Sequence, residues 1–227
     1  MTRLRDALIS VLLLVALLPV LLVAGGVNWL LTRRILFRQV RLGKDLEPFM
    51  ILKFQTMVDG PADASTVTTA QDRRLTPFGR LLRVTKLDEL PQLVNVLRGE
   101  MSLVGPRALT PNEIARVPAD IARRVYAVSP GMTGLASVAF ADEERVVGAA
   151  PDPEMYYFQT MLPQKMALEL AYAAQRSWWL DLLIMAATPL TIILPGATRR
   201  YFLRRFGAGA VSSVPGPEAS LPLGSRE

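Results

Sequence analysis

Two apolar stretches lie near the ends of this chain, and a more polar sequence separates them. Residues 7–32 contain no charged side chain, and residues 177–194 contain only Asp181. At about 1.5 Å per residue, a straight helix over 7–32 reaches roughly 39 Å, which is enough to cross a bilayer. The pattern predicts membrane contact near the N-terminus, whereas the second stretch fits a core helix equally well.

Proline, glycine and flanking charge modify the first prediction. Pro19 removes a backbone hydrogen bond in the middle of the stretch, and Gly25–Gly26 weakens the helix further. Because both flanks are basic, the positive-inside tendency places both in the cytoplasm. We predict that residues 1–35 form a re-entrant membrane helix bent at Leu18–Pro19; a kinked single span is the alternative, and the stretch is too long for a signal peptide. The flanking basic residues are Arg3, Arg5, Arg33, Arg34, Arg38, Arg41 and Lys44.

The central segments combine strand-like and turn-like patterns. Residues 36–57 indicate strand or extended chain around a lone Lys53. Residues 58–74 are small and polar, which is typical of a surface loop. Residues 129–134 form a turn cluster, and its glycines permit a close backbone approach to another strand or to a ligand.

A capping pattern predicts a helix over residues 110–124. Thr110 precedes Pro111 as N-cap and first helical residue, and Glu113 completes a capping box. This helix is expected to be structural.

The last third of the chain is predicted to be helix-rich over residues 154–194. Trp178 and Trp179 suit a membrane interface. A basic amphipathic end follows, which either lies on a membrane surface or is a solvated charge run. Beyond Gly207 the composition indicates a disordered tail. The basic end consists of Arg199, Arg200, Arg204 and Arg205 among Tyr201, Phe202, Leu203 and Phe206.

Composition limits the chemistry that the chain can perform. Its 227 residues include no histidine and no cysteine, so disulfides, thiolate metal sites and the usual proton-transfer groups are excluded. Carboxylates must therefore do most of any chemistry. The formal charge of +6 suits anionic lipid headgroups or phosphorylated substrates, and suits nucleic acid less well.

The acidic pair Asp88 and Glu89 is the candidate for that chemistry. Pro91 is tolerated only in a first helical turn, so we expect a helix to start near residues 86–88. The positive end of the helix dipole would then stabilise both carboxylates and attract phosphate oxygens. A shared Mg²⁺ would relieve the repulsion between the two acids while neutralising a diphosphate.

Nearby arginines complete a set of groups suited to displacement at phosphorus. Arg80, Arg83 and Arg107 can supply bidentate phosphate contacts, while one carboxylate attacks and the other holds the metal. The plain alternative is structural: Thr85 and Asp88 form an ordinary capping box, and the arginines face solvent.

Ordered blocks over residues 8–195 resemble one known family, the bacterial sugar transferases, which are monotopic polyprenyl-phosphate phosphoglycosyl transferases. The blocks include FRQVRLGKDLEPFMILKFQTM, TPFGRLLRVTKLDELPQLVNVLRGEMSLVGPRAL and SPGMTGLASV. The resemblance implies an α+β, mostly helical, membrane-embedded monotopic fold with a re-entrant N-terminal helix, amphipathic helices and a small β element. Residues 36–206 would form a catalytic domain facing the cytoplasm at the bacterial inner membrane, with residues 207–227 as the tail.

The resemblance also implies an activity and roles for individual residues. The reaction would transfer a sugar 1-phosphate from a UDP-sugar to polyprenyl (undecaprenyl) phosphate, releasing UMP. Asp88 looks like the nucleophile and Glu89 like its partner in Mg²⁺ binding. Arg83 looks like a phosphate ligand, and Arg107 and Lys53 look like further substrate contacts.

Two positions depart from the family pattern. Leu18–Pro19 stands where a Ser-Pro is usual, so no hydroxyl caps the bend, and Gln55 stands where an arginine is usual. The chain looks like the minimal catalytic form of the family. Its expected partners are a UDP-sugar, polyprenyl phosphate and the lipid bilayer, with no nucleic acid and with a homodimer left open. The rival functions are an Mg²⁺-dependent lipid-diphosphate hydrolase and a non-enzymatic membrane scaffold.

Overall fold

The computed structural model describes residues 2–58 and 72–207, so most of the expected loop at 58–74 and the expected tail lie outside the described residues. The first elements are α1 (Thr2–Ala16), α2 (Leu18–Thr32), β1 (Leu36–Leu42), the 3₁₀ turn η1 (Lys44–Leu46), β2 (Pro48–Phe54), α3 (Pro77–Val84), the 3₁₀ turn η2 (Leu87–Glu89), α4 (Gln92–Arg98), β3 (Ser102–Val104) and α5 (Pro111–Ile114). The later elements are α6 (Ala119–Val125), β4 (Gly131–Thr133), α7 (Leu135–Ala139), α8 (Glu143–Gly148), α9 (Pro153–Tyr156), the π-helical η3 (Tyr157–Met161), α10 (Leu162–Gln175), α11 (Trp178–Ile193), α12 (Pro195–Phe202) and the π-helical η4 (Leu203–Gly207). The fold is thus mostly helical with small β elements, which confirms the α+β prediction.

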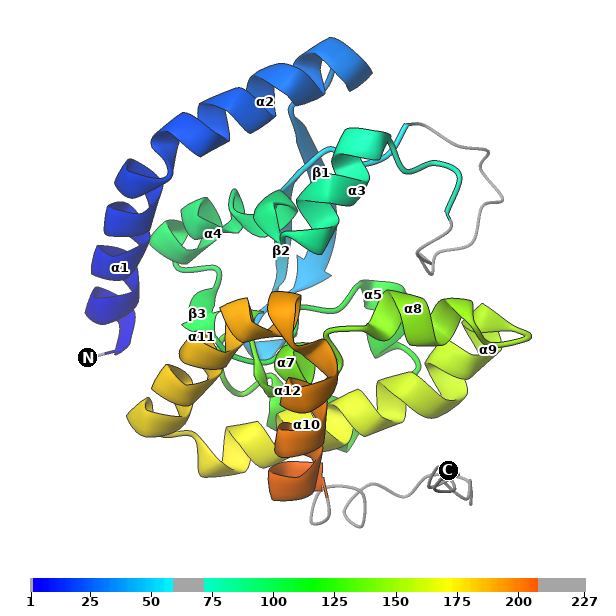
Figure 1. Cartoon of the computed structure of the whole chain (residues 1–227). Helices are drawn as coiled ribbons and strands as arrows, with labels where there is room; N and C mark the ends of the chain where they lie inside the picture. The colour runs from blue at the N-terminus through cyan, green and yellow to red at the C-terminus, as the bar shows by residue number, and fades with distance from the viewer. Residues whose placement is uncertain (1, 59–71, 208–227) are drawn as a thin grey trace.

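The N-terminal helix pair runs along one edge of the molecule (Figure 1). α1 and α2 are bent by 66° at Leu17, where no side chain caps the start of α2. Pro19 lies in the first turn of α2, where its missing N–H costs least. The predicted bend is therefore confirmed, one residue before the expected position. Within the described residues no single helix could cross a bilayer by length and hydropathy, whereas this bent pair passes that test as a unit.

α1 has its polar side chains inside and its leucines outside. Asp6 and Ser10 are buried, whereas Leu4 and Leu12 are each 69% exposed. Asp6 accepts a hydrogen bond from the backbone N–H of Leu103 at 3.4 Å. α1 is thereby fixed to the rest of the domain through β3 and α4.

The predicted extended segment is an antiparallel hairpin of β1 and β2. In its register Arg41 lies opposite Phe49, and Phe37 lies opposite Lys53. Opposed residues in an antiparallel pair share a face, and that face repeats every second residue. The hairpin therefore presents Arg41 and Lys53 on the same side. Asn95 of α4 holds β2 by accepting from Leu52 N–H and donating to the backbone oxygen of Met50.

The chain around the acid pair forms two helices separated by a single turn. Thr76 caps α3 by accepting from Gly79 N–H at 2.8 Å. Lys86 then adopts a positive φ of 59°, η2 makes one 3₁₀ turn, and α4 begins only at Gln92, after Pro91. A helical turn does begin within the expected residues 86–88, at Leu87, but it is 3₁₀ and covers only Leu87–Glu89. The expectation of one helix with Pro91 in its first turn is wrong, because Pro91 directly precedes α4.

The capping box proposed for Thr85 and Asp88 is also wrong. The Thr85 hydroxyl donates back to the carbonyl oxygens of Leu81 and Leu82, at the end of α3. Asp88 is consequently not explained by helix capping.

The glycine-rich turn cluster closes a second, parallel pair of strands, β3 and β4. Val104 pairs with Thr133, and Ser102 pairs with Gly131. A Cβ on Gly131 would collide with the backbone of Gly105, so glycine is required by the approach of one strand to the other. Of the two alternatives, another strand is thus the neighbour.

The predicted helix over residues 110–124 is interrupted. Thr110 and Glu113 do form a reciprocal capping box, as predicted. However, the helix ends at Ile114 and resumes at Ala119, because Pro118 disfavours helical backbone at the residue before it.

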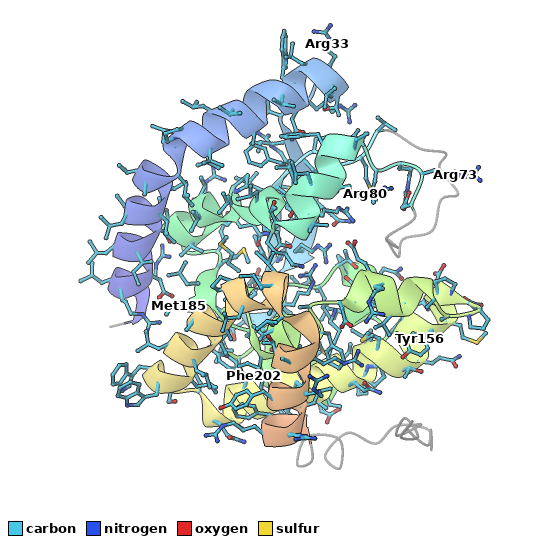
Figure 2. The ribbon with its side chains drawn as sticks, viewed as in Figure 1. Arg33, Arg73, Arg80, Tyr156, Met185 and Phe202 are labelled. Carbon is cyan, nitrogen blue, oxygen red and sulfur yellow. The ribbon has the colours of Figure 1, made fainter. Side chains whose placement is uncertain are left out.

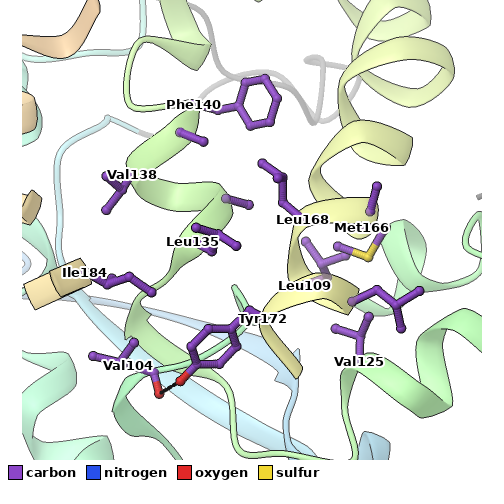
Figure 3. Close-up of a cluster of buried hydrophobic side chains, with 14 of the residues drawn as sticks. Val104, Leu109, Val125, Leu135, Val138, Phe140, Met166, Leu168, Tyr172 and Ile184 are labelled. Carbon is purple, nitrogen blue, oxygen red and sulfur yellow. Dashed lines mark hydrogen bonds between the residues drawn. The ribbon is translucent and has the colours of Figure 1, made fainter. Parts of the chain in front are cut away.

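The main core lies between α7, α10, α11 and the short β3–β4 sheet. Leu135 and Tyr172 are fully buried there, and Tyr172 Oη lies 3.3 Å from the carbonyl oxygen of Val104 (Figure 3). The helix-rich character of residues 154–194 is confirmed, and Pro189 lies inside α11. Trp178 and Trp179 are exposed at the start of α11.

Candidate active site

The two acidic residues of η2 have different partners. Glu89 Oε1 accepts a charged hydrogen bond from Lys53 Nζ at 2.6 Å and lies 3.8 Å from Arg107 Nη1. Asp88 is buried, yet within the described residues its carboxylate makes no hydrogen bond or ion pair. One carboxylate is held in place, and the other is available to react.

Electrostatics separate the two acids further. Burial raises the pKa of Asp88 to about 6, and the neighbouring Glu89 charge raises it as well. Burial also acts to raise the pKa of Glu89, but Lys53 and Arg107 outweigh burial and hold that pKa well below its usual range. Above pH 6 both groups are ionised, and Asp88 is the more basic of the two.

Arg83 of α3 is already engaged by two other side chains. Its Nε donates to Thr56 Oγ1 at 3.1 Å, and its Nη1 forms an ion pair with Glu144 of α8 at 2.9 Å. Its charge acts to lower the pKa of Asp88. A phosphate bound beside Asp88 would compete with Glu144 for this guanidinium.

Arg80 is the predicted site residue that the structure does not bring to the acid pair. It is exposed on α3, and within the described residues it forms no hydrogen bond or ion pair (Figure 2). Of the predicted contacts, Lys53 and Arg107 reach Glu89 directly, whereas Arg83 acts on Asp88 through its charge.

A small cavity beside Glu89 reveals two residues that the sequence did not identify. Arg41 and Gln92 line it together with Lys53, Glu89 and Arg107. The Gln92 side-chain nitrogen and Arg41 Nε are buried and have no hydrogen-bond partner in the part of the chain that the structure describes. Its apolar and backbone walls come from Ile51, Met101, Ala108, Gly131 and Met132.

The charge around this cavity favours an anion. Arg41 forms an ion pair with Glu113 at 3.1 Å, and Lys53 forms one with Glu89, which leaves the charge of Arg107 in excess. The amide of Gln92 and the Nε–H of the Arg41 guanidinium add hydrogen-bonding capacity for an acceptor oxygen. Arg41 lies on the same face as Lys53 because of the hairpin register, and Gln92 lies near Glu89 because α4 begins there. The spacing of residues in the sequence therefore did not identify Arg41 and Gln92 as site residues.

The donor set for a metal consists of the two adjacent acids. Within residues 2–58 and 72–207 no group of three or more acidic side chains is arranged to hold a metal ion. Mg²⁺ commonly uses one or two carboxylates and takes its other ligands from substrate phosphates and water. Asp88 and Glu89 therefore fit an Mg²⁺ ion that arrives with a phosphorylated substrate, with the Lys53 contact as the competitor for Glu89.

The fold and the site together define a class of protein: a phosphate-handling domain that carries a bent, apolar helix pair at its N-terminus. The chain belongs to the bacterial sugar transferase family, whose model matches residues 1–195. The resemblance seen in the sequence is thereby confirmed.

Individual relatives are similar over most of this chain. The UDP-glucose:undecaprenyl-phosphate glucose-1-phosphate transferase of Caulobacter vibrioides is 41% identical over 82% of this chain and 64% of that protein. A protein of the same description from Klebsiella pneumoniae is 36% identical over 82% of this chain and 38% of its own length. An uncharacterized sugar transferase of Bacillus subtilis, EpsL, is 34% identical over 79% of this chain and 82% of its own length. The chain thus spans less than two thirds of the first two relatives.

Proposed function

We propose that this protein is a phosphoglycosyl transferase that moves a sugar 1-phosphate from a UDP-sugar to polyprenyl phosphate, with release of UMP. The names of the relatives support undecaprenyl phosphate as the acceptor and UDP-glucose as the first donor to test. Such a reaction is the first membrane step in assembling a glycan such as an exopolysaccharide, an O-antigen or a glycoprotein glycan.

The main support for the proposal is that two adjacent carboxylates have different surroundings. Lys53 and Arg107 hold Glu89, whereas Asp88 is buried, ionisable near neutral pH and unpartnered among the described residues. A desolvated carboxylate with no hydrogen bond to break is a good nucleophile.

In the first step, an oxygen of Asp88 attacks the β-phosphorus of the UDP-sugar. The bond from that phosphorus to the bridging oxygen breaks, and UMP leaves with the electron pair. In the second step, a phosphate oxygen of the polyprenyl phosphate attacks the aspartyl phosphosugar, and Asp88 leaves as a carboxylate. Arg83 and Arg107 stabilise charge on the phosphoryl oxygens in both steps.

Mg²⁺ is part of the proposal as a cofactor held by Glu89 and Asp88 together with the diphosphate. When bound, it would neutralise phosphate charge and favour departure of UMP. Lys53 keeps Glu89 ionised, and both residues line the small cavity.

We further propose that the helix pair is re-entrant in the bacterial inner membrane and that the catalytic domain faces the cytoplasm. Support comes from the bend at Leu17, from the outward-facing leucines of α1 and from the exposed Trp178 and Trp179. This arrangement would place the acid pair near the headgroups, where the acceptor phosphate lies. Cysteines introduced at residues 2 and 45 test it, because labelling from opposite faces of the membrane contradicts a re-entrant topology.

The activity is tested by measuring UMP release from a panel of UDP-sugars in membranes that contain undecaprenyl phosphate. The expected result is UMP together with a lipid-linked sugar diphosphate for at least one donor. Free sugar phosphate as the product would favour a hydrolase, and no UMP with any donor would favour a scaffold.

A further inference from the structure

Glu169 of α10 is a fully buried acid that the mechanism above does not use. Its side chain is 0% exposed. Oε1 accepts a hydrogen bond from the backbone N–H of Arg107 at 3.1 Å, and Oε2 is buried without a hydrogen-bond partner among the described residues. Glu169 therefore contacts the loop that follows β3 through a single oxygen.

The backbone of Arg107 is held from three directions. Glu169 accepts from its N–H, and Tyr126 Oη at the end of α6 donates to its carbonyl oxygen at 2.6 Å. Arg107 also forms a bridge with Gly131 at the start of β4. A residue whose N–H and C=O are both engaged by other elements has little freedom in φ and ψ, so its side chain leaves the backbone in a fixed direction.

No cation neutralises Glu169 within the described residues. Lys165 lies one turn earlier on α10, but its Nζ donates to Glu143 at 2.7 Å. Burial raises the pKa of Glu169 to about 7, against smaller opposing effects from Arg107 and Lys165. A buried carboxyl without a charge partner costs stability, so an acid here is better explained by what its acceptor oxygen holds than by packing.

We propose that Glu169 is a positioning residue for Arg107: by accepting the Arg107 N–H, it fixes the loop so that the guanidinium points at Glu89 and at the substrate phosphate. The role of Arg107 toward the substrate phosphate rests on the proposed function. The positioning of the loop by Glu169 rests only on the hydrogen bond between Glu169 and the Arg107 N–H. Because a misplacement of about 1 Å at a catalytic group can cost about 100-fold in rate, a side chain that touches no substrate can have a large effect.

The positioning is tested by hydrogen exchange on the full chain in lipid nanodiscs, which needs no turnover. Glu169→Leu removes the acceptor, whereas Glu169→Gln keeps an acceptor oxygen at nearly the same place. We expect exchange in the peptide covering residues 105–109 to be at least about tenfold faster in Glu169→Leu and within about twofold of wild type in Glu169→Gln. Equal exchange in all three proteins would overturn the proposal.

The action through Arg107 is tested by a double-mutant cycle on kcat/KM for UMP release. We expect Glu169→Leu to lower kcat/KM by about 10- to 100-fold alone, but by less than about threefold on top of Arg107→Ala. Glu169→Gln should restore most of the lost rate. Fully multiplicative losses would mean that Glu169 does not act through Arg107, and loss of turnover in Glu169→Gln would mean that its charge, not its acceptor oxygen, is required.

The two proposals fail in different ways. A wild-type protein that releases no UMP from any UDP-sugar contradicts the proposed function, while the exchange experiment still decides whether Glu169 holds the loop. An active wild type with independent losses at Glu169 and Arg107 contradicts only the positioning.

Discussion

Leucine side chains have opposite exposure in α1 and in the core around α7. In α7, Leu135 is fully buried among apolar neighbours (Figure 3). In α1, Leu12 is 69% exposed, whereas Asp6 is buried against the domain. An exposed leucine row is unfavourable in water but not in lipid, so the comparison supports the proposal that α1 faces the bilayer while α7 lies in the protein core.

The contact between the two regions is accordingly polar. Arg5 of α1 bridges Asp6 and Asp181 of α11, each at 3.0 Å. Tyr172 Oη donates to the other oxygen of Asp181 at 2.7 Å. Charged hydrogen bonds are directional, so they fix how α1 sits on the domain more sharply than leucine packing would.

The largest expected effect separates chemistry from membrane association. Asp88→Asn removes the nucleophile, and we expect UMP release to fall by more than about 10³-fold, because one required covalent step is lost. Membrane association should be unchanged, since Asp88 lies in η2 and not in the helix pair. Radiolabelled UDP-sugar turnover and flotation on a sucrose gradient measure the two properties.

Asp120→Asn provides the matched control, because Asp120 is an exposed acid in the first turn of α6. It should retain wild-type turnover. Robust turnover by Asp88→Asn would contradict the assignment of the nucleophile.

The second-largest expected effect comes from making the same leucine-to-alanine substitution in the core and in α1. Leu135→Ala should destabilise the folded domain by about 2–5 kcal/mol, as expected for a core cavity. Leu12→Ala should leave the unfolding temperature of the detergent-solubilised chain nearly unchanged, yet weaken vesicle binding by about tenfold. Equal loss of thermal stability in the two variants would show that α1 faces the protein interior instead.

A smaller effect is expected where the two regions meet. Asp181→Asn weakens the contact with Arg5 and should cost about 1–3 kcal/mol of stability. Combined with Arg5→Gln, the two losses should be non-additive by at least about 0.5 kcal/mol, as measured by chemical denaturation in detergent. Additive losses would mean that the crosslink does not couple α1 to the domain.

The smallest effect concerns the pH dependence of the reaction. The pKa of Asp88 is raised to about 6, so its nucleophilic form is lost as the pH falls through 6. We expect kcat/KM to fall about tenfold per pH unit below the inflection, and a higher Mg²⁺ concentration to move the inflection downward from about 6, because the cation favours the carboxylate. An inflection that rises with Mg²⁺ concentration would argue against a shared metal.

The sequence predicted local features well and long-range ones poorly. Pro19 located the bend within two residues, and the capping box of Thr110 and Glu113 formed as expected, because each depends on neighbouring residues only. The interruption before Ala119 was not predicted, because a capping box marks where a helix begins and not where it ends, whereas Pro118 disfavours helical backbone at Val117.

Within the site, the acids and most cations were predicted, but their partners were not. Arg41 enters the cavity through strand register, and Gln92 through the start of α4. Glu169 lies 62 residues from Arg107 in sequence, and no periodicity links the two. Contacts of this kind depend on tertiary packing, which a single sequence does not display.

The short connection between α2 and β1 has a consequence for how the protein senses its surroundings. α2 ends at Thr32, β1 begins at Leu36, and the register sets Lys53 opposite Phe37. At about 3.3 Å per residue, no more than about 17 Å of chain separates the end of α2 from the level of this cation. Under the proposed seating of the helix pair in lipid, a thinner or thicker bilayer would move Lys53 together with the helix pair, and bilayer thickness would then set the height of the acid pair.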